Sequence, residues 1–405
     1  MNMDELYAKL VIKKGINLKK GEEVFINSSV ETSDFARKLC KCAYENGAKK
    51  VIVNYTDEQI TLLKLLHEDK ATLEKIDAWQ IAQKDYMPDN KCAYINILSS
   101  SPDAYESADG EKLTALSRAQ RLAYKKFYDS SKGDKFKWNI IGYPSKRWAD
   151  KVVGESDNSV EKLKTLIFKA MRLDNSDPLK AWTEHGQNLK KIYKYLTCMQ
   201  FDSFHYTNSL GTDLTVKMPE NHVFNGGGDE TEDGRGFIAN MPTEEVFSAP
   251  HKYGVNGTVY SSMPLVHNGK IVKDFYFTFK DGKVIDYGAK EGKEVLTDIL
   301  TTDEGASYLG EIAFVGYDTP IRKLDTLFYN TLFDENASCH FALGSAYVSC
   351  VKGASTMSRE EQDKAGLNYS VEHVDFMIGT ADLDIVATTK DGQKVQIFKD
   401  GNFVI

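Results

Sequence analysis

The chain has 405 residues, of which 41% are apolar and 27% are charged, and this composition is typical of a folded globular protein rather than a disordered or collagenous one. Its length exceeds what a single hydrophobic core usually organises, so we expect two domains. The 51 basic and 59 acidic residues give a net charge of −8, which excludes a general attraction to nucleic acid or to an anionic membrane.

The first half of the chain alternates strand-like and helix-like segments. Apolar runs at 22–28, 49–55, 92–100 and 135–144 predict strands, and amphipathic stretches at 33–48 and 113–130 predict helices between them. This alternation is typical of a mostly parallel sheet covered by helices. Two further helices are predicted over 159–173 and 178–199, where they would bridge two domains. Residues 1–195 are therefore expected to form an α/β N-terminal domain that includes these bridging helices.

After Phe201 the chain changes to short β-branched and aromatic runs separated by turn residues. The strongest signal is a hairpin, in which Asp281-Gly282 joins the runs 273–280 and 283–289. One helix is expected over 291–300. Residues 196–405 are thus predicted to form an α+β domain rich in antiparallel strands.

Several common catalytic signatures do not occur in the sequence. It contains no G-x-x-x-x-G-K-[ST] phosphate loop, no G-x-S-x-G nucleophile turn and no H-E-x-x-H zinc helix. Any active site must therefore be assembled from separated segments of the chain.

Two of these segments carry histidines. His373 and Asp375 lie two residues apart in a strand-like run, so their side chains share one face and could form half of a metal site, or could simply be exposed at a strand edge. Glu335, His340 and Tyr347 fall within thirteen residues, and an imidazole with a phenol suits metal binding and oxyanion stabilisation. Taken singly, His340 and Tyr347 could equally be packed core residues.

Two other segments carry carboxylates. Glu311 stands in an otherwise apolar run, where a buried carboxylate requires a nearby cation unless the position is exposed. Glu244 and Glu245 are adjacent, so at most one of them can face inward from a strand. Together, these carboxylates, imidazoles and the tyrosine are the groups from which a two-metal hydrolytic site is built.

Four segments make the chain resemble a known family. TEEVFSAPH (243–251), LGEIAFVG (309–316), ENASCHFALGSAY (335–347) and EHVDFMIGTADLDI (372–385) occur in the order and at about the separations seen in the M29 metalloaminopeptidases of the aminopeptidase T and aminopeptidase S type. The resemblance continues through the N-terminal half, for example in CAYENGAKKVIVNY (42–55), but only the C-terminal segments are diagnostic.

The resemblance implies a metal-dependent aminopeptidase with two divalent cations per chain, Zn or Co in the first place and Mn or Mg as alternatives. A metal-activated water would attack the first peptide carbonyl and release the N-terminal residue. Glu335 matches a ligand or a general acid/base, Tyr347 matches an active-site tyrosine, and Glu244 stays open as an alternative to Glu245 as a ligand. The metal ligands that the resemblance implies are Glu245, Glu311, His340, His373 and Asp375.

The resemblance also implies partners. The substrates would be small peptides with a free N-terminus, and the enzyme would be a homodimer. Because neither a signal peptide nor a run of about 20 apolar residues is found in the sequence, we expect a cytoplasmic protein that binds neither membrane nor nucleic acid. Two other functions fit the same residues: another dinuclear metal hydrolase, such as an amidase or phosphoesterase, and a nucleotide-binding or scaffold protein with a structural metal.

Overall fold

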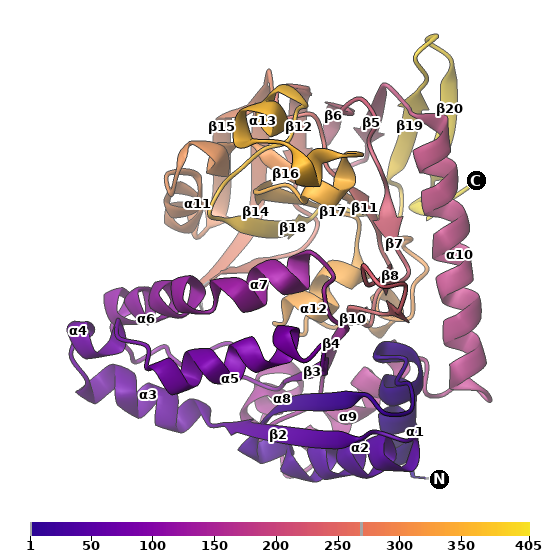
Figure 1. Ribbon diagram of the computed structural model, residues 1–405. Coiled ribbons are helices and arrows are strands. Elements are labelled where there is room, and N and C mark those ends of the chain that lie inside the picture. The colour runs from indigo at the N-terminus through magenta and orange to yellow at the C-terminus, as the bar shows by residue number, and fades with distance from the viewer. Residues whose placement is uncertain (1, 268–269) are drawn as a thin grey trace. The chain divides into compact units, whose positions relative to one another are not determined.

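The computed structural model describes residues 2–267 and 270–405 and divides the chain into two compact units (Figure 1). The first unit comprises residues 1–184 and 228–242, and the second comprises residues 185–227 and 243–405. The division falls within α10 (Pro178–Met199), and a short segment from the second half of the sequence belongs to the first unit. No helix in the described part of the chain is long and apolar enough to cross a membrane.

The first unit is built on a five-stranded sheet with the order β10-β4-β3-β1-β2. All of its strand pairs are parallel, which confirms the predicted parallel sheet. The edge strand β10 comes from the segment 228–242, which the sequence did not assign to this sheet. The strands are β1 (Glu23–Ser29), β2 (Lys50–Thr56), β3 (Ala93–Leu98), β4 (Trp138–Gly142) and β10 (Asn240–Met241), and the same segment forms the small ribbon β8 (Asp229–Glu230) and β9 (Gly236–Phe237).

Helices follow the strands of this sheet along the chain (Figure 1). In α2 the buried residues Phe35, Ala36, Leu39 and Ala43 recur at helical spacing, which is why this stretch forms an amphipathic helix. The helices are α1 (Met3–Leu10), α2 (Ser33–Glu45), α3 (Glu58–His67), α4 (Lys70–Leu73), α5 (Ala78–Asp89), α6 (Gly110–Ala123), α7 (Lys125–Lys132), α8 (Lys146–Val153) and α9 (Ser159–Ala170).

The second unit contains two antiparallel sheets, which confirms the predicted antiparallel character of the C-terminal half. The larger, nine-stranded sheet has the order β13-β14-β12-β6-β5-β19-β20-β21, with β15 pairing on β14 in the predicted hairpin. Its strands are β5 (Ser203–Thr207), β6 (Asp213–Lys217), β12 (Val255–Tyr260), β13 (Leu265–His267), β14 (Lys270–Lys280), β15 (Lys283–Glu291), β19 (Asp384–Thr388), β20 (Lys394–Lys399) and β21 (Asn402–Phe403).

The smaller sheet has five strands in the order β18-β17-β16-β11-β7. Its strands are β7 (Asn225–Gly226), β11 (Val246–Ser248), β16 (Leu309–Phe314), β17 (His340–Gly344) and β18 (His373–Met377). The short helices α11 (Lys293–Leu300), α12 (Thr331–Asp334) and α13 (Arg359–Lys364) lie between its strands along the chain.

Aromatic side chains join the two sheets of the second unit into one core. Phe314 of β16 lies 5.2 Å from Phe204 of β5, measured between ring centroids, and Phe376 of β18 lies 5.1 Å from Phe277 of β14. All four rings belong to a single buried hydrophobic cluster. One face of the smaller sheet therefore packs into the hydrophobic core, and polar functional side chains can lie only on its other face.

Candidate metal centre

Four of the predicted site residues lie on one face of the smaller sheet. Strand register places Glu311 of β16 opposite Ala342 of β17, which is itself opposite Asp375 of β18. His340 lies two residues before Ala342, and His373 lies two residues before Asp375. Because side chains alternate along a strand, all four side chains point away from the aromatic core.

Small residues leave room for these side chains. Ala313 is opposite His340 and Gly344 is opposite His373, so each imidazole faces a residue with little or no side chain. Gly344 has a φ of 102°, and a Cβ at this position would lie 2.3 Å from the carbonyl oxygen of Glu372. A larger residue would therefore separate β17 from β18 at the point where His373 lies.

The donor atoms form two groups that share one carboxylate. In the first group, His340 Nε2 lies 3.2 Å from Glu245 Oε2 and 3.7 Å from Glu311 Oε1. In the second, His373 Nε2 lies 3.3 Å from Glu311 Oε2 and 3.4 Å from Asp375 Oδ1. Within each group the donor atoms all lie within 4.8 Å of one another. The two oxygens of Glu311 thus face different imidazoles, as expected for a carboxylate that bridges two cations.

Backbone carbonyls hold both imidazoles in one orientation. His340 Nδ1 lies 3.0 Å from the carbonyl oxygen of Ser338, and His373 Nδ1 lies 2.8 Å from that of Ser345. A carbonyl only accepts hydrogen bonds, so each Nδ1 carries the donated proton. In the neutral imidazole this leaves the Nε2 lone pair directed at the carboxylates, which is the arrangement of metal-binding histidines.

The cluster concentrates negative charge in a buried place. The side chains of Glu311 and His340 are only 6% and 1% exposed. Burial lowers the pKa of His340, but the hydrogen bonds to Glu245 and Glu311 outweigh this effect and raise that pKa well above its ordinary value. Among the described residues, no lysine or arginine nitrogen lies within 4 Å of the Glu245, Glu311 or Asp375 oxygens. This set of oxygen and imidazole donors fits divalent cations, which would neutralise it.

The remaining two predicted residues border the cluster. Glu335 follows α12 directly, and its pKa is raised well above its usual range by burial and by the charges of Glu245 and Asp375. The ring of Tyr347 lies 5.3 Å from that of His373, and desolvation raises the pKa of its hydroxyl group, which therefore keeps its proton. Tyr347 is 42% exposed, so a molecule that enters from solvent can reach it.

The adjacent glutamates Glu244 and Glu245 point to different partners. Glu245 Oε2 faces His340, whereas Glu244 Oε2 lies 3.5 Å from His185 Nε2. The backbone N–H of Glu244 also donates a hydrogen bond of 2.7 Å to Oδ1 of the fully buried Asn336. Sequence reasoning missed His185 and Asn336, because neither stands in a pattern that separates it from an ordinary structural polar residue.

Comparisons with known proteins agree over the full length of the chain. A family model described as thermophilic metalloprotease (M29) matches residues 2–403. Aminopeptidase AmpS of Bacillus subtilis (strain 168) is 42% identical over 399 residues, covering 98% of this chain and 97% of the relative. Aminopeptidase T of Thermus aquaticus is 36% identical over 406 residues, covering 100% and 98%. The solved structure of wild-type AmpT from Thermus thermophilus superposes with a TM-score of 0.94 at 34% identity, covering 100% of this chain and 99% of that one.

Proposed function

The chain belongs to the M29 metalloprotease family and is a metal-dependent aminopeptidase, and on this basis we propose that it binds two divalent cations between β11, β16, β17 and β18. One cation would be held by Glu245, Glu311 and His340, and the other by Glu311, His373 and Asp375. The observation that carries this proposal is the pair of three-residue donor groups that share Glu311. Imidazole with carboxylate suits Zn or Co, and Mn or Mg can use the same donors.

Cations bound at these positions would lower the pKa of a water molecule and polarise the carbonyl group of the first peptide bond. The charges of Glu245 and Asp375 act on Glu335 and help to raise its pKa. Bound cations would offset those charges and lower this pKa, and the Glu335 carboxylate could then accept a proton from the attacking water and return it to the leaving amine. The protonated phenol of Tyr347 can donate a hydrogen bond to the oxyanion that forms. The carboxylates around the site also favour the positive charge of a free N-terminus.

We infer that the substrates are small peptides with a free N-terminus, because the site is rich in carboxyl groups. In the described part of the chain, no lysine or arginine nitrogen lies within 4 Å of the Glu245, Glu311 or Asp375 oxygens. The homodimeric state remains an expectation from the family resemblance, and the cytoplasmic location remains an expectation from the sequence. The same resemblance matches Tyr347 to an active-site tyrosine and Glu335 to a ligand or a general acid/base.

The decisive experiment compares short peptides with free and with N-acetylated termini. The protein is stripped by a chelator and then resupplied with Zn, Co, Mn or Mg, and the released amino acid is measured. We expect cleavage of the free-amine peptides alone, one residue at a time, and only after metal is restored. Two ions bound per chain without any cleavage would instead favour a different metal-dependent hydrolase.

A further inference from the structure

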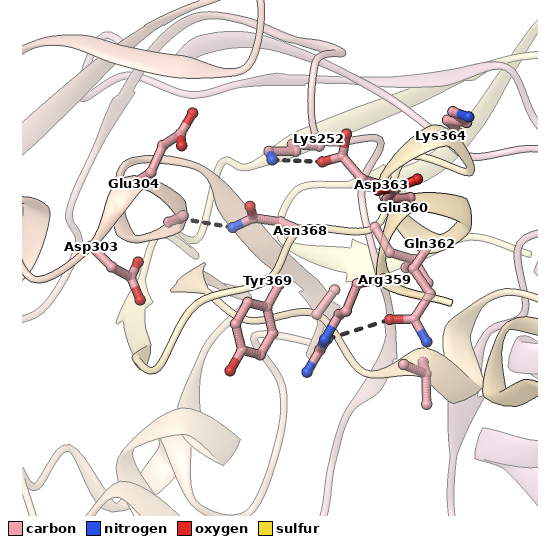
Figure 2. A pocket seen from close by; sticks show the side chains of 14 residues that line it. Lys252, Asp303, Glu304, Arg359, Glu360, Gln362, Asp363, Lys364, Asn368 and Tyr369 are labelled. Atoms are coloured by element: carbon pink, nitrogen blue, oxygen red, sulfur yellow. Dashed lines mark hydrogen bonds and ion pairs between the residues drawn. The ribbon is translucent and has the colours of Figure 1, made fainter. Parts of the chain in front are cut away.

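A second concave site lies in the same unit, beside α13. It is a half-open pocket of about 620 Å³ (Figure 2). Four acidic residues (Asp303, Glu304, Glu360, Asp363) and three basic residues (Lys252, Arg359, Lys364) line it. This nearly balanced charge disfavours a polyanion such as a nucleotide and favours a ligand that carries both signs.

Arg359 is the one pocket cation that is held in place without a carboxylate partner in the part of the chain that the structure describes. Lys252 is ion-paired with Asp363 at 2.7 Å, and the Lys364 side chain makes no hydrogen bond or ion pair with the described residues. Its guanidinium carbon lies 3.5 Å from the centre of the Tyr369 ring, and it donates one hydrogen bond, of 3.3 Å, to Gln362 Oε1. A stacked guanidinium with free N–H groups is suited to bind a carboxylate in a bidentate manner.

The opposite charge is found on another wall of the pocket. Figure 2 shows Glu304 away from Arg359, and its carboxylate makes no hydrogen bond or ion pair with the described residues. Between them lies Asn368, which is 3% exposed and donates to the carbonyl oxygens of Gly305 (2.7 Å) and Gly344 (2.6 Å). Its Oδ1 is buried and accepts no hydrogen bond from the described chain. An unpaired buried acceptor is unfavourable, so an N–H group at this position would be stabilising.

We propose that this pocket binds a short peptide as a zwitterion, with its carboxylate on Arg359 and its ammonium and amide N–H groups toward Glu304 and Asn368 Oδ1. A volume of about 620 Å³ is within the range of small-ligand sites and exceeds what a single amino acid needs. The inference rests on the proposed function in one respect, because it takes a peptide to be the ligand.

The ligand would be a second peptide molecule rather than the far end of the substrate. Ala346 and Val348 line the pocket, whereas Tyr347 between them packs on Phe247 and His373. The backbone of Tyr347 is extended (φ −77°, ψ 124°) and a 3-10 turn begins at Val348. The side chain of Tyr347 therefore leaves the chain in a different direction from the pocket-lining side chains of its two neighbours. The segment is also tied to the pocket wall, because the Ala346 N–H donates to the Asn368 carbonyl oxygen at 2.9 Å.

Calorimetric titration of the metal-loaded full-length protein tests this site. The probe is a dileucine analogue whose peptide bond is replaced by CH₂–NH, so that it cannot be hydrolysed, together with its C-terminal amide. We expect two molecules of the probe per chain but one of the amide. Arg359→Gln should weaken one of the two binding events about tenfold or more. The control Lys390→Gln, which makes the same change in charge at an exposed residue outside the pocket, should leave both events unchanged.

Two results would overturn the inference. If Arg359→Gln leaves both binding events intact, or if Lys390→Gln weakens binding equally, Arg359 does not bind a carboxylate in this pocket. If a single molecule binds and both amidation and Arg359→Gln weaken it, the carboxylate belongs to the substrate itself and no second molecule is bound. Hydrolysis of free-amine peptides is followed on the same preparations, so a failure of the proposed function is detected separately.

Discussion

Replacing Glu244 and Glu245 by glutamine, one at a time, tests the geometry of the metal centre most directly. Glu245→Gln removes a charged donor whose oxygen lies 3.2 Å from His340 Nε2, while the size of the side chain is kept. Changes outside the donor set of a metal site typically cost 10–100-fold, so loss of a direct donor should lower kcat/KM by at least about 100-fold. This corresponds to about 2.7 kcal/mol of lost transition-state stabilisation.

Glu244→Gln is the matched control, because it makes the same chemical change one residue earlier. The carboxylate of Glu244 faces His185 at 3.5 Å, and its backbone hydrogen bond to Asn336 survives the substitution. We expect kcat/KM within about threefold of the wild type and a free energy of unfolding lower by about 1 kcal/mol. Steady-state hydrolysis and metal titration of both variants provide the measurement. The reasoning is refuted if Glu244→Gln loses activity while Glu245→Gln keeps more than about a tenth of it.

Three further perturbations test other parts of the structure. Glu311→Gln and His340→Ala should each reduce kcat to less than about a tenth of the wild-type value, while circular dichroism shows a largely intact fold. If either variant keeps more than this activity, the metal centre does not lie where these residues meet. Asn336→Ala removes hydrogen bonds of 2.7 and 2.9 Å from buried backbone groups, so urea titration should show a loss of about 2–4 kcal/mol, and an unchanged midpoint would contradict this. Burial, with a smaller effect of Asp229, raises the pKa of Asp134 to about 7. Because the folded state then holds a proton that the unfolded state releases near pH 4, stability should fall by about 1–2 kcal/mol between pH 4 and 7, after allowance for solvent screening. Asp134→Asn should abolish that part of the pH dependence, as thermal unfolding at several pH values would reveal.

Much of the fold follows from patterns within short segments. The strands at 23–29 and 93–98 were predictable because buried apolar side chains dominate them, and the hairpin at 270–291 because Asp281-Gly282 favours a tight turn. β10 was not predictable, because two residues carry no periodicity and their pairing with β4 spans about a hundred positions.

Some residues of the metal centre could also be predicted from short sequence patterns, and others could not. Glu311 stood out because a carboxylate in an apolar strand is costly to bury, and His373 and Asp375 because residues two apart share a strand face. The choice between Glu244 and Glu245 depends on the residue at which β11 begins, and sequence patterns locate such boundaries poorly. The role of Asn336 depends on contacts with a segment 92 residues away, which no local pattern contains.

Because residues 228–242 belong to the first unit, that unit cannot complete its sheet early during synthesis on the ribosome. The sheet of that unit gains its edge strand β10 only after residue 241 has been made, when residues 185–227 of the other unit have already been synthesised. Until then β4 presents an unpaired edge, which is a site for aggregation. A fragment that ends at residue 195 would keep this edge permanently, so the two halves of the chain cannot be separated by a single cut without leaving one sheet incomplete.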